Sequence, residues 1–274
     1  MNQEHDNAHL QLHLHRQNTV HRLPAWLRVI PWLLTVLSAN FLHYGCLLQA
    51  RAQAQRSAGG SLPPLSFNLM RSPLMRLVRY RIKLLRYLET LVFLLLLGPL
   101  LPELAAPFYA DWGMAEACLL GFLAGLITIF LNENKSLDMR TPWYPYLDFN
   151  STFYGHMWDA VRVAGGSLLV PFEEELFYHS WMYRYFCSRL SGKEQHQSLL
   201  DVPFSECNWG ALIATNGFMA IYNGKEWRSS GLSGLFSNWV IVRRGRFMDG
   251  VFAHAIRNIT INIWVLVTDQ RQFW

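Results

Sequence analysis

Charged residues are scarce in this chain, and their scarcity argues against an ordinary soluble domain. Only 16% of the 274 residues are charged, whereas soluble domains average roughly 25%. Hydrophobic residues make up 51%, including 11 Trp, 17 Phe and 11 Tyr. Mean hydropathy is only +0.10 because polar residues are concentrated in residues 1–25, 50–72, 132–152 and 191–208. Composition therefore predicts a membrane protein whose apolar segments between those stretches form helices.

Cysteine is also sparse, and the sequence shows neither a signal peptide nor an internal repeat. The four cysteines have no Cys-x-x-Cys spacing, which argues against a zinc ribbon and a disulfide framework. Residues 1–25 contain five histidines but no apolar core and no small-residue cleavage site. We therefore predict a disordered, His-rich polar tail there rather than a signal peptide. A transporter built from repeated halves would show an internal repeat, and none is visible, which argues against that function.

The basic residues, 24 against 19 acidic ones, gather just before a long apolar run. A nucleic-acid-binding protein would instead carry a basic patch on a soluble fold with stacking aromatics. We predict no nucleic-acid partner, and read the patch as the cytoplasmic flank of a membrane helix that contacts lipid. The basic side chains of this flank belong to Arg71, Arg76, Arg79, Arg81, Lys83 and Arg86.

Apolar segments recur along the chain at lengths suited to a bilayer. A hydrocarbon core of about 30 Å needs about 20 helical residues. We predict an all-α, polytopic membrane bundle of about eight transmembrane or membrane-embedded helices, in a single domain over residues 26–274. The Lys and Arg residues between these segments predict that both termini lie outside the cytoplasm. The segments are 26–48, 87–108, 113–131, 154–171, 172–190, 207–222, 229–243 and 248–268.

Two details refine the predicted helices. Gly121 and Gly125 give the third segment a face of small residues, which suits close packing against another helix. Pro171 is expected to end the fourth segment, because proline disrupts a helix interior.

Three adjacent acids, Glu173, Glu174 and Glu175, lie in an apolar context directly after Pro171. Ionisable groups at membrane depth are costly, so such a cluster indicates a functional site. Adjacent residues are 100° apart on a helix, so the three carboxylates cannot all face one partner. The alternative is a helix amino-terminus, where acidic residues interact favourably with the helix dipole.

Two pairs with i, i+4 spacing accompany the acids. Glu175 and His179 share one helical face, as do His254 and Asn258. Either pair could contribute ligands to a divalent ion. Either could also make only a hydrogen bond between helices. The spacing alone leaves both interpretations open.

Taken together, these residues resemble the CPBP family of intramembrane metalloproteases, also called the CAAX prenyl protease family. The family motifs are EExxxR, FxxxH and HxxxN. The chain has Glu174-Glu175-x-x-x-His179, Phe218-x-x-x-Tyr222 and His254-x-x-x-Asn258 in the same order. The likeness extends from residue 26 onward and is greatest to the bacterial branch that accompanies exosortase systems. It is supported by Arg28-Val29-Ile30-Pro31, Pro171, Glu226-Trp227 and Arg243-Arg244-Gly245-Arg246.

The resemblance implies a metal-dependent intramembrane endopeptidase. A divalent ion, expected to be zinc, would polarise the peptide carbonyl and the attacking water, and Glu174 would remove the proton. Glu174, His254 and Asn258 would belong to the metal site, with Glu175 as the second catalytic acid. The resemblance also implies a multi-pass protein of a bacterial inner membrane. Its substrate would be a membrane protein or peptide, and an exosortase-type sorting system would be its partner.

Two positions depart from the family motifs. His179 stands where the family has Arg, and Tyr222 stands where it has the metal-binding His of the second motif. A phenol with a pKa of about 10 ligates a metal less readily than imidazole. His179 is a candidate substitute ligand, but on a regular helix it shares a face with Glu175 and not with Glu174. The alternative function is an inactive membrane scaffold or interaction protein that lost a ligand at Tyr222.

Overall fold

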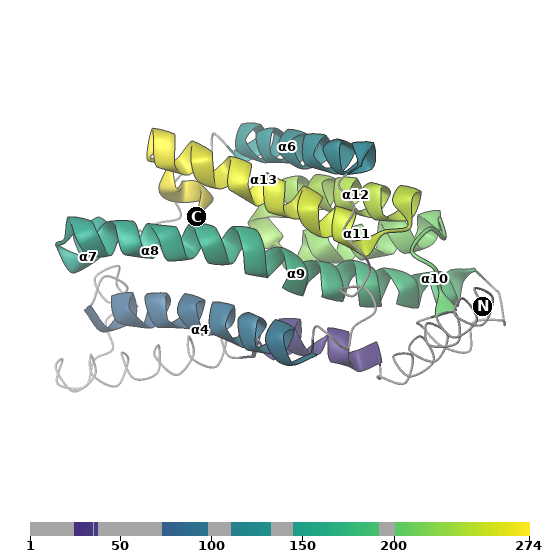
Figure 1. Ribbon diagram of the computed structural model, residues 1–274, viewed down its shortest axis with the longest axis horizontal. Coiled ribbons are helices and arrows are strands. Elements are labelled where there is room, and N and C mark those ends of the chain that lie inside the picture. The colour runs from purple at the N-terminus through teal and green to yellow at the C-terminus, as the bar shows by residue number, and fades with distance from the viewer. Residues whose placement is uncertain (1–24, 35, 38–72, 98–110, 133–144, 192–200) are drawn as a thin grey trace, which may run out of the picture.

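The computed structural model describes residues 25–34, 36–37, 73–97, 111–132, 145–191 and 201–274. Helices dominate these residues and none of them forms a strand. Figure 1 shows long helices lying side by side in layers. The predicted all-α class is therefore confirmed. The predicted tail lies outside the described residues except for Ala25, and the number of spanning helices and the orientation of the termini stay predictions.

Within the described part of the chain, two helices are long and apolar enough to cross a bilayer, α6 (Trp112–Asn132) and α13 (Phe247–Thr268). They lie side by side in Figure 1. An added Cβ at Gly121 would come within 2.2 Å of the Ala253 carbonyl oxygen, and one at Gly125 within 2.7 Å of Thr260 Cβ. The predicted small-residue face of α6 is thus the surface on which α13 packs.

Substituting Gly121 by alanine should destabilise the protein, because the obstructing atom belongs to the α13 backbone and cannot rotate away. We expect a loss of about 1–3 kcal/mol in the free energy of unfolding, measured by denaturant unfolding in detergent. Gly217→Ala is the matched control, since nothing lies within 4 Å of an added Cβ there. Equal stability of both variants would contradict the close contact.

A single helical rod runs through the middle of the bundle in Figure 1. It joins α8 (Thr152–Ala164), a π-helical turn η3 (Gly165–Leu169), α9 (Val170–Glu175), a second π-helical stretch η4 (Leu176–Tyr183) and α10 (Arg184–Leu190). The predicted break at Pro171 between two helices is therefore wrong. Proline removes one hydrogen bond and crowds the preceding turn. The wider π-helical turn just before it shifts the hydrogen-bond register, which lets the helix continue.

The helix α4 (Pro73–Leu97) begins well before the predicted residue 87, and residues 98–108 of that prediction lie outside the described part. The basic flank is thus partly helical. Leu, Arg and Lys are good helix formers, and proline suits the first helical position. The many charged residues indicate a loop between two helices, whereas Leu, Arg and Lys have a high helix propensity.

The remaining predicted helices can be compared with the observed ones by their first and last residues. Helices α11 (Trp209–Tyr222) and α12 (Trp227–Arg244) match the sixth and seventh predicted segments, with a 3-10 turn η6 (Gly224–Glu226) between them. Of the first predicted helix, η1 (Ala25–Arg28) and helical residues 30–34 and 36–37 are described. The short elements α7 (Pro145–Phe149) and η7 (Arg271–Phe273) complete the described fold.

Apolar and polar side chains are distributed as in a membrane protein. Phe130 on α6 is 75% exposed and Val267 on α13 is 78% exposed, while Glu173 is fully buried and His179 is 1% exposed. A bundle surrounded by lipid can present large apolar side chains outward and keep ionisable ones inside. The buried ionisable residues of the central rod therefore define the candidate site.

Candidate functional site

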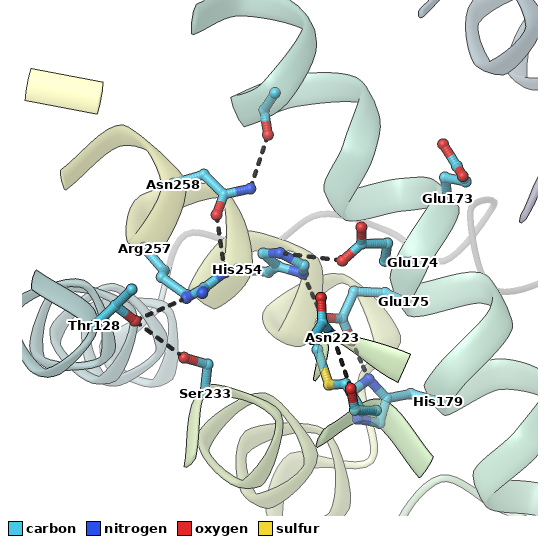
Figure 2. A network of polar contacts seen from close by, with 12 residues as sticks. Thr128, Glu173, Glu174, Glu175, His179, Asn223, Ser233, His254, Arg257 and Asn258 are labelled. Carbon is cyan, nitrogen blue, oxygen red and sulfur yellow. Dashed lines mark hydrogen bonds and ion pairs between the residues drawn. The ribbon is translucent and has the colours of Figure 1, made fainter. Parts of the chain in front are cut away.

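The three consecutive acids lie in the middle of the central rod, where α4 and α13 approach it (Figure 2). Each acid has a different environment. Glu173 points away from His254, Glu174 points toward it, and Glu175 lies buried between two imidazoles. The fan of directions is that expected for successive helical residues.

Glu173 is a structural acid bound to α4. Its carboxylate accepts a hydrogen bond from Arg86 Nε at 3.1 Å and another from Thr90 Oγ1 at 3.0 Å. Because Glu173 is fully buried, its charge requires this guanidinium and hydroxyl. Arg86 and Thr90 are four residues apart on α4, which places both on the face that meets the rod.

Arg86 also binds the next acid. Its Nη2 lies 3.1 Å from Glu174 Oε1, so one guanidinium joins two adjacent carboxylates. The side chain of Glu174 is 25% exposed, unlike its two neighbours. Its other oxygen, Oε2, lies 3.8 Å from His254 Nε2. Glu174 is therefore fixed by one oxygen while the other faces an imidazole.

Glu175 joins two helices through two histidines. Its Oε1 accepts from His254 Nδ1 on α13 at 2.9 Å, and its Oε2 bonds to His179 Nδ1 within the rod. All three side chains are buried, with Glu175 at 1%, His179 at 1% and His254 at 3% exposure. A carboxylate accepts both N–H groups, so each ring carries its proton on Nδ1. His254 Nε2 is the ring nitrogen that faces Glu174.

A π-helical stretch, η4, positions His179. The stretch begins one residue after Glu175, and π-helical segments often occur at functional sites. The Glu175–His179 contact is the i, i+4 pair expected from the sequence. His179 Nε2 is buried and has no hydrogen-bond partner among the described residues. His179 thus supports Glu175 through Nδ1 and does not reach Glu174.

Asn258 lies one turn beyond His254 on α13, but its side chain is directed elsewhere. Its Nδ2 donates to the Gly166 carbonyl at 2.8 Å, and its Oδ1 accepts from Arg257 at 3.2 Å (Figure 2). The Gly166 carbonyl belongs to the π-helical turn η3. Asn258 therefore ties α13 to the central rod, and its oxygen already binds a cation.

Tyr222 is at the end of α11 and is half exposed. Its ring packs against Trp32, with ring centroids 5.3 Å apart. Trp32 in turn stacks on Phe177 of the rod at 4.0 Å. The aromatic side chain at this position of the second motif thus packs against Trp32 at the rim of the site.

The arrangement of these side chains does not fit a bound zinc ion. Among the described residues, no group of three or more His, Cys, Asp or Glu side chains is placed to hold a metal. Asn258 Oδ1 faces a guanidinium, and Tyr222 packs against the ring of Trp32. Structural and catalytic zinc sites usually have three or four protein ligands. Glu174, Glu175, His179 and His254 are brought together, whereas Asn258 is hydrogen-bonded to Gly166 and Tyr222 packs against Trp32.

Arg86 is the site residue that sequence reasoning missed. It was assigned to a basic membrane flank, whereas it binds two of the three acids. Its helical spacing to Thr90 was visible, and so was the absence of the Arg that the first family motif normally has. Once His179 occupies that motif position, a guanidinium from another helix is the natural partner for the acids.

Comparison with known proteins supports the resemblance. Residues 156–260 match the family model described as type II CAAX prenyl endopeptidase Rce1-like. No curated protein and no solved structure matches the chain. The matched segment includes all three motifs, from Glu174 to Asn258, and runs from α8 through most of α13. The family match and the two apolar helices indicate an integral membrane protein, which over residues 156–260 is similar to the CAAX (CPBP) protease family.

Proposed function

We propose that this protein is an intramembrane endopeptidase that hydrolyses peptide bonds with Glu174 as its general base. The observation that carries the proposal is the pair formed by Glu174 Oε2 and His254 Nε2, 3.8 Å apart inside the family-matched segment. A general base must be within hydrogen-bond reach of the proton it removes. Glu174 is also the least buried of the three acids, which leaves it accessible to a substrate.

The hydrogen bonds around this pair assign a role to each neighbour. Glu175 accepts a hydrogen bond from His254 Nδ1, and a neutral His254 would present an unprotonated Nε2 to Glu174. A water that donated one hydrogen to Glu174 and the other to His254 would have its lone pairs free for a peptide carbonyl. Glu174 would take the proton as the water attacked, and would later pass it to the leaving amine. Arg86 keeps the opposite oxygen of Glu174 fixed during these steps.

The resemblance predicts a bound zinc ion, whereas the donor arrangement described above does not favour one. Metal analysis of protein purified in detergent tests it, with His254→Ala as the comparison. From the arrangement we expect less than one zinc ion per chain, with no difference between parent and variant. One zinc ion per parent chain that is lost in His254→Ala would instead establish a metal site.

The proposed activity is tested by incubating the protein in lipid nanodiscs with a library of membrane-spanning peptides. We expect new peptide termini, identified by mass spectrometry, in samples of the parent protein. His254→Ala should produce none of them, since it removes one of the two groups that hold the attacking water. Products that appear equally with both proteins would come from a contaminating protease and would oppose the proposal.

Arg86→Lys should lower the turnover number about tenfold with little change in KM, because lysine keeps the charge but loses the fork that binds two carboxylates. The Michaelis parameters are measured on a peptide found in the library. Arg189→Lys on α10 is the control, since its guanidinium lies over the ring of Tyr185, 5.6 Å from the centroid, and not beside the acids. A similar loss in both variants would argue against a positioning role for Arg86.

A second candidate function is a catalytically inactive membrane scaffold or interaction protein. The placement of Tyr222 against Trp32, instead of a histidine beside Glu174, favours it. The same peptide library separates the two candidates, because a scaffold yields no new termini. Under the endopeptidase proposal, the substrate is a membrane protein or peptide. The chain crosses a bacterial inner membrane several times. Its partner is an exosortase-type sorting system.

A further inference from the structure

An apolar groove lies between α11 and α12, the two helices that the turn η6 joins. These helices pack against each other in Figure 1. The volume of the groove is about 460 Å³, within the range of roughly 300–1,000 Å³ that is usual for ligand pockets. No residue of the candidate site is among the described residues that line it. Its wall includes Ile213, Gly217, Gly231, Leu232 and Leu235.

A single charged side chain, that of Arg228, is among the described residues that line the groove. Its guanidinium lies 5.2 Å from the ring centroid of Trp227, and both side chains are exposed. The neighbouring acid Glu226 instead lines the cavity that contains Arg86 and Asn258. The groove is therefore largely apolar along its length and positively charged at the end next to η6.

Contacts with α6 show how deep the groove lies in the membrane. The last residue of α6, Asn132, donates a hydrogen bond from Nδ2 at 3.1 Å to the Oγ of Ser229, which directly follows Arg228. Glu116, near the other end of α6, pairs with Arg243 near the end of α12, so the two helices are antiparallel. A helix that spans the bilayer ends near the polar interface, where tryptophan is enriched. The charged end of the groove thus lies at the interface, and its apolar wall extends about 10 Å inward along α12, at 1.5 Å per residue.

We propose that this groove binds one acyl chain of an anionic phospholipid and that Arg228 holds the headgroup. The phosphate of such a lipid lies at the interface and its chain lies below, which is the order of charge and apolar surface in the groove. A guanidinium can form two-pronged hydrogen bonds with phosphate oxygens. A helix from a partner protein would cover the apolar wall but need not bring a negative charge to Arg228. Because the groove and the candidate site share no described residue, the inference goes beyond the proposed hydrolysis and does not depend on it.

The test is native mass spectrometry of the full-length protein in a neutral detergent, with two phospholipids that carry identical acyl chains. Phosphatidylglycerol is anionic, whereas phosphatidylcholine has no net charge. We expect phosphatidylglycerol to bind saturably, with one molecule per chain. Its Kd should be about fivefold lower than that of phosphatidylcholine, because one basic residue near an anionic lipid contributes about this factor.

Gly217→Leu fills the groove and tests where the acyl chain lies. Nothing lies within 4 Å of an added Cβ at Gly217, so a larger side chain can enter the groove without displacing a neighbour. We expect this variant to keep the Tm of the parent. It should bind both phospholipids at least about tenfold more weakly, because the chain loses several buried CH₂ groups.

Arg228→Gln tests the contact with the headgroup at an exposed position, so its result does not rely on interior packing. The two phospholipids should then bind with equal affinity. Arg189→Gln on α10 is the matched control, because Arg189 is also exposed and lies over a neighbouring ring, that of Tyr185, outside the groove. It should leave the preference for phosphatidylglycerol unchanged.

The proposal is overturned if the parent binds the two phospholipids equally, or if either groove variant folds and binds them like the parent. Should Gly217→Leu fail to fold, Arg228→Gln decides alone. A dimer of parent chains that Gly217→Leu disrupts, without any change in bound lipid, would assign the groove to a second copy of the chain and would also overturn the proposal.

Discussion

Glu174→Gln should lower the turnover number for peptide cleavage by about 10²–10⁴-fold, the usual contribution of a positioned general base. Glutamine has nearly the same shape and can still accept a hydrogen bond from Arg86, but it cannot take a proton from water. KM should change little, because the substitution removes an interaction made mainly in the transition state. The measurement is steady-state cleavage of a library-derived peptide in nanodiscs.

The fold of this variant should survive, which makes the comparison informative. Glu174 is 25% exposed, and the buried charge of Glu173 keeps its bonds to Arg86 and Thr90. Glu116→Gln on α6 is the matched control, since its partner Arg243 is 57% exposed and Glu116 lies outside the three motifs. A Glu174→Gln protein that retained a tenth or more of the parent turnover would remove Glu174 from the role of base.

Glu175→Gln should have the largest effect on stability of any single change at the site. The buried carboxylate accepts from two imidazoles on two helices. A glutamine side chain can accept from one of them through its oxygen, while its NH₂ group would face the N–H of the other. Disrupting a buried charge-assisted network typically costs about 3–5 kcal/mol. We expect a loss of that size in denaturant unfolding in detergent.

The control for this prediction is again Glu116→Gln, whose partly exposed ion pair should be worth less than about 1 kcal/mol. A second substitution, His179→Asn, separates the two halves of the network. It removes one imidazole but leaves the bond between Glu175 and His254, so the loss should be smaller than for Glu175→Gln. Equal losses for Glu175→Gln and Glu116→Gln would show that the network contributes nothing specific.

The apolar helices could be predicted from the sequence because their signal is local. Residue spacing and run length are properties of a continuous segment, and α6, α11, α12 and α13 were expected close to their observed bounds. The small-residue face of α6 at Gly121 could also be predicted from a continuous segment of sequence. Its contact with α13 depends only on the absence of side chains at two positions one turn apart.

Pro171 shows where local reasoning failed. The expected break rests on a clash in a regular α-helix, whereas the π-helical turn at Gly165–Leu169 changes the geometry just before it. No sequence rule of helix termini predicts such a turn. The early start of α4 is a related error, because charge was given more weight than the helix preference of Leu, Arg and Lys.

The site itself was predictable in part. The pairing of Glu175 with His179 follows from i, i+4 spacing along one helix. The contact of Glu175 with His254 joins residues on different helices, and only tertiary packing determines it. The same holds for Arg86, which reaches the acids from α4, and for Asn258, whose amide is turned to Gly166 by the approach of α13 to the rod.

Peptide hydrolysis in water enriched with ¹⁸O tests the central claim most directly. If Glu174 activates a water for attack, peptides cut by the parent protein in nanodiscs should carry one ¹⁸O atom in each newly formed carboxyl group. Glu174→Gln should form such labelled termini at least about a hundredfold more slowly. Labelled termini that form at the same rate with Glu174→Gln, or no labelled termini with either protein, would contradict the account.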